Sequence, residues 1–203
     1  MHDEPINRYP LPRPSLRFFP RLTDFEKHPR AWSFPRYLES STEPWVRTLR
    51  DLYAHPIAFP SSMSAEAGLL LHSLVRNIRP RTVVEVGTFV GVSTLWMAAA
   101  LEEAARDPGG APVAPDQTRG IIHCFDVFAP VPRAEWRDAE LTEDRLEFVR
   151  AWLTRAGLAH RAVFHRGDSA AQILACREQL RGPSPDPRAP ELHPGGVDFA
   201  LID

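Results

Sequence analysis

The stretch of sequence that decides the fold is Val84-Glu85-Val86-Gly87-Thr88-Phe89-Val90-Gly91-Val92-Ser93. A β-branched run that begins at Thr82 leads into it and is typical of a buried strand, and an apolar helix follows it. Gly87 lets the backbone turn sharply off the strand, and Gly91 permits close approach of a ligand at the start of the helix. The first turn of that helix presents free N–H groups and a positive dipole end. The stretch therefore predicts a strand–turn–helix unit that binds a ligand.

Strands and helices alternate along the rest of the chain. After a short helix that Thr42-Glu43-Pro44 would cap, hydrophobic periodicity predicts helices over 65–78, 90–106, 142–156 and 170–181, and strands over 82–86, 121–125, 162–165 and 197–202. This order implies an α/β fold, in which right-handed crossovers place helices on both faces of a parallel sheet. Such sheets bind ligands beyond the carboxyl ends of their strands, where the strand order reverses. We therefore expect the chemistry at the end of the first strand.

The spacing of the glycines discriminates between cofactors. A dinucleotide fingerprint has the form G-x-G-x-x-G, and its second glycine admits a pyrophosphate. Here Phe89 occupies that position within the pattern E-x-G-x-x-x-G-x-S, which disfavours a dinucleotide. Glu85 lies in an otherwise apolar strand, and a buried carboxylate is costly unless it is paired. We therefore expect Glu85 to meet either a ligand or a fixed hydrogen-bond donor.

The same stretch resembles a known cofactor motif. Glu85 to Ser93 is similar to the S-adenosylmethionine (SAM) motif of class I SAM-dependent methyltransferases, above all the small-molecule O-methyltransferases of the catechol and caffeoyl-CoA type and their bacterial relatives. The likeness extends upstream to Met63-Ser64-Ala65-Glu66-Ala67-Gly68. Downstream it extends to Asp126, to Gly167-Asp168-Ser169 and to Phe199-Ala200-Leu201-Ile202-Asp203. It covers residues 61–203 and implies a Rossmann-like domain that transfers a methyl group from SAM to an oxygen of a small molecule.

The resemblance also implies a role for each matching position. Glu85 and Gly87 would line the methionine part of SAM, with Thr88, Phe89 and Gly91 in the same loop, and Ser93 would bind its carboxylate. Met63 and Ser64 would contact the methionine end, and Asp126 would accept both ribose hydroxyls. Gly167, Asp168 and Ser169 would border the adenine, although Asp168 and Ser169 could also cap the following helix. Asp203 would be the catalytic residue beside the methyl donor and, as in cation-dependent relatives, a ligand of a metal such as Mg²⁺.

Two regions make up the predicted domain organisation. Residues 1–60 form a Pro-rich arm and a helix, which would serve as a lid on the same domain or mediate homodimerisation. Residues 61–203 form the SAM-binding domain. Class I methyltransferases have seven strands, whereas this chain supplies signals for about four. We therefore expect the domain to be incomplete at its C-terminus, and the remaining ligands of a metal at Asp203 to come only with a complete chain.

Composition excludes several classes of partner. The net charge of −2 gives no sign of nucleic acid or of an anionic membrane as partner, and no apolar run reaches the length of a membrane span. The N-terminus does not have the pattern of a signal peptide, so we expect a cytoplasmic protein. The small-molecule acceptor is what the resemblance to O-methyltransferases implies. Cys124 and Cys176 are expected as isolated, reduced core thiols, and the eight histidines form no metal-ligand spacing.

Two other functions stay open on sequence grounds. One is a nucleotide-dependent oxidoreductase on a Rossmann sheet, against which Phe89 argues. The other is a SAM-binding or assembly protein without catalytic activity.

Overall fold

The computed structural model of the protein describes Phe34 and residues 36–58, 61–106, 120–133, 139–181 and 196–202. The expectations for most of the Pro-rich arm and for Asp203 lie outside the described residues. Within the described part of the chain, no helix is long and apolar enough to cross a membrane.

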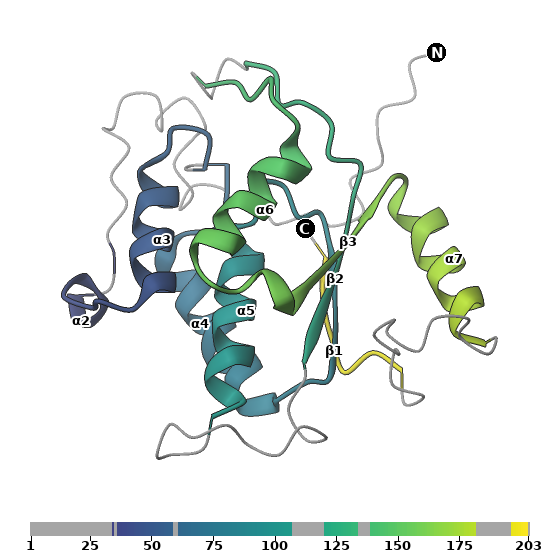
Figure 1. The fold of residues 1–203 in the computed structure, drawn as a ribbon, viewed down its shortest axis with the longest axis horizontal. Coiled ribbons are helices and arrows are strands. Elements are labelled where there is room, and N and C mark those ends of the chain that lie inside the picture. Colours follow the sequence, from purple (N-terminus) through teal and green to yellow (C-terminus); the bar gives the residue numbers. More distant parts are fainter. Residues whose placement is uncertain are drawn as a thin grey trace, which may run out of the picture. The chain divides into compact units, whose positions relative to one another are not determined.

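A four-stranded parallel sheet forms the centre of the fold (Figure 1). Its strands are β1 (Thr82–Val86), β2 (Ile121–Asp126), β3 (Ala162–Arg166) and β4 (Phe199–Ile202), in the order β3-β2-β1-β4. The chain therefore moves outward from β1 to β3 and returns to the other side of β1 for β4, so the order reverses beside β1. This confirms the predicted α/β fold and places the reversal next to the stretch quoted above.

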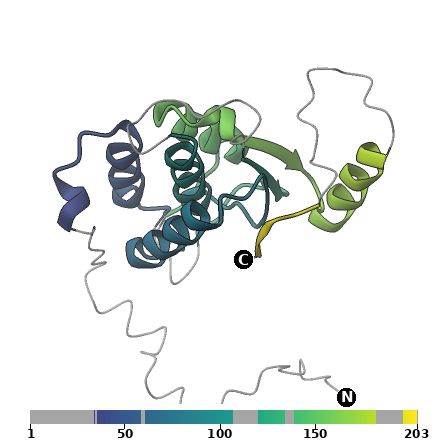
Figure 2. The same ribbon diagram turned by 90° about the horizontal axis from the view of Figure 1, so that it is seen from below.

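Helices cover both faces of the sheet, as predicted (Figures 1 and 2). One face carries α3 (Pro44–Ala54), α4 (Ala65–Ile78), α5 (Val92–Ala104) and α6 (Arg145–Arg155). The other face carries α7 (Ser169–Arg181), which lies against β2 and β3. Two shorter helices complete the described elements, α2 (Arg36–Glu39) and the 3₁₀ turn η2 (Ala159–Arg161).

Several helix starts differ from the predicted ones because of their caps. The helix expected from Thr142 begins at Arg145, since the side chain of Asp144 accepts hydrogen bonds from the N–H groups of Leu146 (2.9 Å) and Glu147 (3.2 Å). The cap of α3 is Glu43, whose side chain makes no capping hydrogen bond, rather than Thr42. The helix expected from Val90 begins at Val92, after Gly91 in a left-handed conformation.

The core lies mainly between the sheet and the packed helices α3, α4 and α5. The α5 helix is buried nearly all round, as its apolar sequence predicts, and Trp96 at its centre is fully buried. Gly68 of α4 allows the two helices to approach, because a Cβ atom there would lie 2.0 Å from Nε1 of Trp96. Among the apolar residues of α4, Leu71 and Val75 are buried, whereas Leu70, Leu74 and Ile78 are exposed.

The two cysteines differ in their surroundings. Both thiols are free, as predicted. Cys124 of β2 is a buried core residue, whereas Cys176 is only partly buried, so the expectation of a core position was wrong for Cys176. The reason is that Cys176 lies on α7, the one described helix on its face of the sheet.

Candidate cofactor site

The candidate site lies where β1, β2 and β3 end, because a predicted site residue lies at or directly after the end of each strand. Hydrogen bonds join the three strand ends: Gly87 N–H donates to Phe125 O (3.0 Å), and Gly167 N–H donates to Asp126 O (3.0 Å). The turn after β1, residues 87–91, contains three positive φ angles, at Gly87 (87°), Phe89 (47°) and Gly91 (81°). The structure thus brings the loop, the end of β2 and the turn after β3 into one continuous rim.

Phe89 adopts a backbone conformation that glycine would take without strain. Its φ of 47° is unusual for an aromatic residue, and it is held by a hydrogen bond from its N–H to Oδ2 of Asp126 (2.9 Å). The turn therefore keeps a left-handed residue at the second fingerprint position but adds a phenyl ring where a dinucleotide needs open space. This geometry strengthens the sequence argument against a dinucleotide.

Gly91 has a packing role in addition to its position at the start of α5. A Cβ atom there would lie 2.8 Å from Cγ1 of Val149 on α6. Because its φ is also positive, both the conformation and the space require glycine. The sequence pattern indicated a ligand as the reason for this residue, and the close approach of α6 is a second reason that it did not reveal.

Glu85 is fully buried and accepts hydrogen bonds from three hydroxyl groups. Thr88 Oγ1 (3.0 Å) and Thr94 Oγ1 (2.6 Å) donate to Oε2, and Ser93 Oγ (2.5 Å) donates to Oε1. Burial raises the pKa of the carboxyl group, and the three hydroxyl donors lower it in part. The sequence predicted that Glu85 meets either a ligand or a fixed hydrogen-bond donor. The structure shows fixed donors, and all three belong to the chain itself. Sequence reasoning had not included Thr94, whose hydroxyl type is unremarkable in the first turn of a helix.

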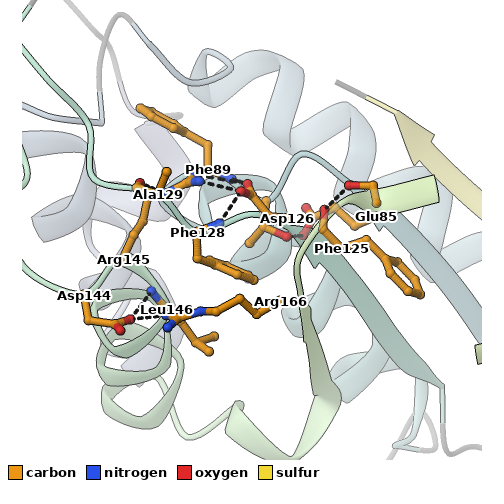
Figure 3. A network of polar contacts seen from close by, with 12 residues as sticks. Glu85, Phe89, Phe125, Asp126, Phe128, Ala129, Asp144, Arg145, Leu146 and Arg166 are labelled. Carbon is orange, nitrogen blue, oxygen red and sulfur yellow. Dashed lines mark hydrogen bonds and ion pairs between the residues drawn. The ribbon is translucent and has the colours of Figure 1, made fainter. Parts of the chain in front are cut away.

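Asp126 forms a buried ion pair with Arg145 of α6 (Figure 3). Arg145 Nη1 donates to Oδ2 (3.0 Å), Nη2 donates to Oδ1, and the N–H of Phe128 donates to Oδ1 (2.8 Å). Together with Phe89 N–H, these donors use both carboxylate oxygens. Arg145 also donates through Nε to Ala129 O (2.8 Å). Nothing in the sequence pattern singled out Arg145, because an arginine in the first turn of an amphipathic helix is normally exposed.

The remaining predicted residues make local contacts at the starts of helices. Ser64 caps α4 by accepting from Ala67 N–H (3.3 Å), and Met63 packs partly buried against the core. Asp168 caps α7 by accepting from Ala171 N–H (2.9 Å), and Ser169 Oγ donates to Phe125 O (3.4 Å). The capping role considered for Asp168 is therefore present. Contact of these residues with a cofactor stays a prediction.

Comparisons with known proteins agree with the cofactor motif. Residues 84–203 match the family model described as a methyltransferase domain. A mouse (Mus musculus) protein, catechol O-methyltransferase domain-containing protein 1, is 35% identical over 126 residues, which make up 61% of this chain and 42% of that protein.

Solved structures of methyltransferases are also similar. They include the O-methyltransferase TomG from Streptomyces achromogenes in complex with SAM (22% identity, 81% of this chain, 54% of that chain, TM-score 0.46). Another is an O-methyltransferase from Bacillus cereus in complex with SAH (20% identity, 83% of this chain, 59% of that chain, TM-score 0.44). The chain thus spans about half the length of these relatives. Because the family model matches more than half of the chain, from within β1 to its last residue, this protein belongs to the methyltransferase domain family.

Proposed function

We propose that this chain is the cofactor-binding part of a SAM-dependent methyltransferase that transfers a methyl group to an oxygen of a small molecule. One observation carries the proposal: in a chain of the methyltransferase domain family, the glycine turn after β1 is tied to an aspartate at the end of β2. The catechol O-methyltransferase domain of the mouse relative supports oxygen as the acceptor atom.

The residues at the strand ends fit the polar parts of SAM. Gly87 and Phe89 shape the turn, the first turn of α5 offers backbone N–H groups to a carboxylate, and Asp126 offers carboxylate oxygens to hydroxyl groups. SAM supplies a methyl group that is already activated by the sulfonium. The work of the protein is therefore to align cofactor and acceptor and to exclude water.

Glu85 has a positioning role in this proposal. It lies beneath the turn with no exposed surface, and its hydroxyl partners Thr88 and Ser93 belong to the loop and the helix start that would surround the methionine group. The carboxyl group therefore fixes the shape of the cradle. Asp126 requires a rearrangement, because ribose hydroxyls can bind its oxygens only if Phe89, Phe128 or Arg145 gives up a hydrogen bond to them.

Calorimetric titration of the 203-residue chain tests the cofactor. We expect SAM and S-adenosylhomocysteine to bind and NADPH not to bind. Asp126→Asn should weaken SAM binding by about 1.5–3 kcal/mol for each charge-assisted hydrogen bond lost. The matched control is Asp144→Asn, which changes an exposed acid next to Arg145 and keeps a residue that can cap α6, so its SAM affinity should be unchanged. Equal affinities for the two variants would remove Asp126 from the site.

Three finer proposals accompany this function. Asp203 would act beside the methyl donor and bind Mg²⁺ in a longer chain, where chelation would abolish activity and Asp203→Asn would remove the response to Mg²⁺. Residues 1–60 would act as a lid or form a homodimer. Sedimentation of the full chain would detect the homodimer.

A cytoplasmic location would be tested by fractionation. SAM binding without methyl transfer in a longer chain would instead favour the non-catalytic alternative.

A further inference from the structure

Three side chains with metal-binding chemistry converge on the α7 face of the sheet. They are His123 of β2, His165 of β3 and Cys176 of α7. His123 pairs with Val163 and Phe125 pairs with His165, so the two histidines are diagonal neighbours on adjacent parallel strands and share one face. The α7 helix packs on these same two strands and places Cys176 beside them. Separations of 42 and 11 residues along the chain hide this cluster from a search for ligand spacing.

The distances suit a single metal ion. Nδ1 of His123 lies 3.0 Å from Nε2 of His165, and the ligand atoms of all three residues lie within 4.8 Å of one another. In a tetrahedral zinc shell, Zn–N bonds of about 2.0–2.1 Å and a Zn–S bond of about 2.3 Å put ligand atoms about 3.3–3.6 Å apart. A small opening between the two nitrogens and an inward turn of the Cys176 side chain would close such a shell.

The surroundings of the histidines favour metal binding. The ring of His165 stacks on that of Phe125, with centroids 4.3 Å apart, and its centroid lies 5.3 Å from that of His123, so its orientation is restricted. His123 is buried and His165 is half-buried, so both rings lie largely out of solvent, and a neutral imidazole is a common ligand of metal ions. Without a metal, the N–H of one histidine donates a hydrogen bond to the ring nitrogen of the other.

The donor set selects the kind of ion. Two imidazole nitrogens and one thiolate sulfur suit a borderline ion such as Zn²⁺, whereas Mg²⁺ prefers oxygen ligands. We propose that His123, His165 and Cys176 form a zinc site that joins α7 to β2 and β3, with water as the fourth ligand. On binding, the thiol of Cys176 loses its proton, whereas the hydrogen between the histidines moves to the other nitrogen of the donor ring, so both imidazoles stay neutral and one proton is released. This proposal does not depend on the proposed methyl transfer.

Cobalt spectroscopy of the tag-free, chelator-treated chain tests the site directly. Because the sequence contains only Cys124 and Cys176, a thiolate ligand must be one of these two residues. We expect one equivalent of Co²⁺ to give tetrahedral visible bands and a thiolate-to-cobalt charge-transfer band, and one equivalent of Zn²⁺ to abolish both. Zn²⁺ should also raise the thermal midpoint of the wild-type chain.

Matched cysteine variants identify the ligand. Cys176→Ser should lose the charge-transfer band and weaken Zn²⁺ binding by more than about tenfold. Cys124→Ala is the control, because Cys124 is buried beside Glu85 and lies one residue from His123, so its side chain points to the opposite face of the sheet. It should keep the band. Circular dichroism checks that each variant is folded. If Cys176→Ser does not fold, His165→Gln serves as the ligand variant in its place.

Three outcomes would overturn the proposal. One is a folded wild-type chain without the charge-transfer band, which would leave the histidines as a hydrogen-bonded pair only. The second is a band that survives in Cys176→Ser. The third is a Zn²⁺ affinity that is the same in wild type and in the ligand variants.

Discussion

Asp126 and Arg145 are both buried, with exposed fractions of 7% and 6%, and each neutralises the other. Removing one member of such a pair leaves an uncompensated charge in the interior. We expect Asp126→Ala to lower the free energy of unfolding by about 3–5 kcal/mol in urea titrations. The double variant Asp126→Ala/Arg145→Met leaves no charge behind, so its free energy of unfolding should fall by less. If the double variant is at least as unstable as the single one, the stranded charge is not the cause.

Glu85 gives a prediction about pH. Burial raises the pKa of its carboxyl group in the folded chain above the unfolded value. Its contribution to stability is therefore complete below the unfolded pKa and is lost as pH rises through the folded pKa. Glu85→Gln is neutral at every pH and keeps the size and an acceptor oxygen. Its stability relative to wild type, measured by urea unfolding, should rise as pH increases above about 4.5. Parallel pH curves for the two proteins would contradict this.

At the residue scale, the sequence revealed acids more readily than their partners. Glu85 and Asp126 were conspicuous because a carboxylate in or at the end of an apolar strand is costly without a partner. Arg145 and Thr94 were not, because their residue types are ordinary in the first turn of a helix and only the fold shows that they face these carboxylates. The cluster of histidines and Cys176 was missed for a similar reason, since its contacts are made between separate elements.

At the element scale, two glycines with similar backbone angles separate strain from packing. Gly91 has φ of 81° and lies against Val149, whereas Gly157 has φ of 75° and no atom within 4 Å of the position that a Cβ atom would take. Gly157→Ala should cost only the left-handed strain of about 1–2 kcal/mol. Gly91→Ala should add an overpacking cost of about 1–3 kcal/mol. Thermal and urea unfolding would measure both costs. Equal losses of stability in the two variants would show that α6 moves away from the new methyl group without an energetic penalty.

The elements themselves were largely predicted, and their boundaries less so. The helix over 65–78 and the strand over 82–86 have the predicted bounds, because a cap, a proline or a glycine marks both ends. The start of α6 was wrong because Thr142 and Asp144 are both capping residue types, and only Asp144 points its oxygen at the first turn.

At the scale of the whole molecule, the leucines of α4 include both exposed residues and a core residue. Leu70 and Leu74 are 63% and 45% exposed, whereas their neighbour Leu71 is 6% exposed. We expect Leu74→Lys to change the free energy of unfolding by less than about 0.5 kcal/mol and to reduce binding of a hydrophobic dye. Leu71→Ala should cost about 2–5 kcal/mol, because it opens a cavity against the core. A large loss of stability in Leu74→Lys would mean that this face is covered in solution.

The order of the sheet has a practical consequence for handling the protein. Within the described part of the chain, β4 pairs with β1 alone, and Ile202 on it is 77% exposed. A strand whose second edge has no partner offers its row of N–H and C=O groups to any other extended segment. Concentrated samples of this 203-residue chain should therefore form oligomers on storage, and light scattering would follow their growth. A short peptide that occupies the edge of β4 should slow that growth and improve the yield of monodisperse material.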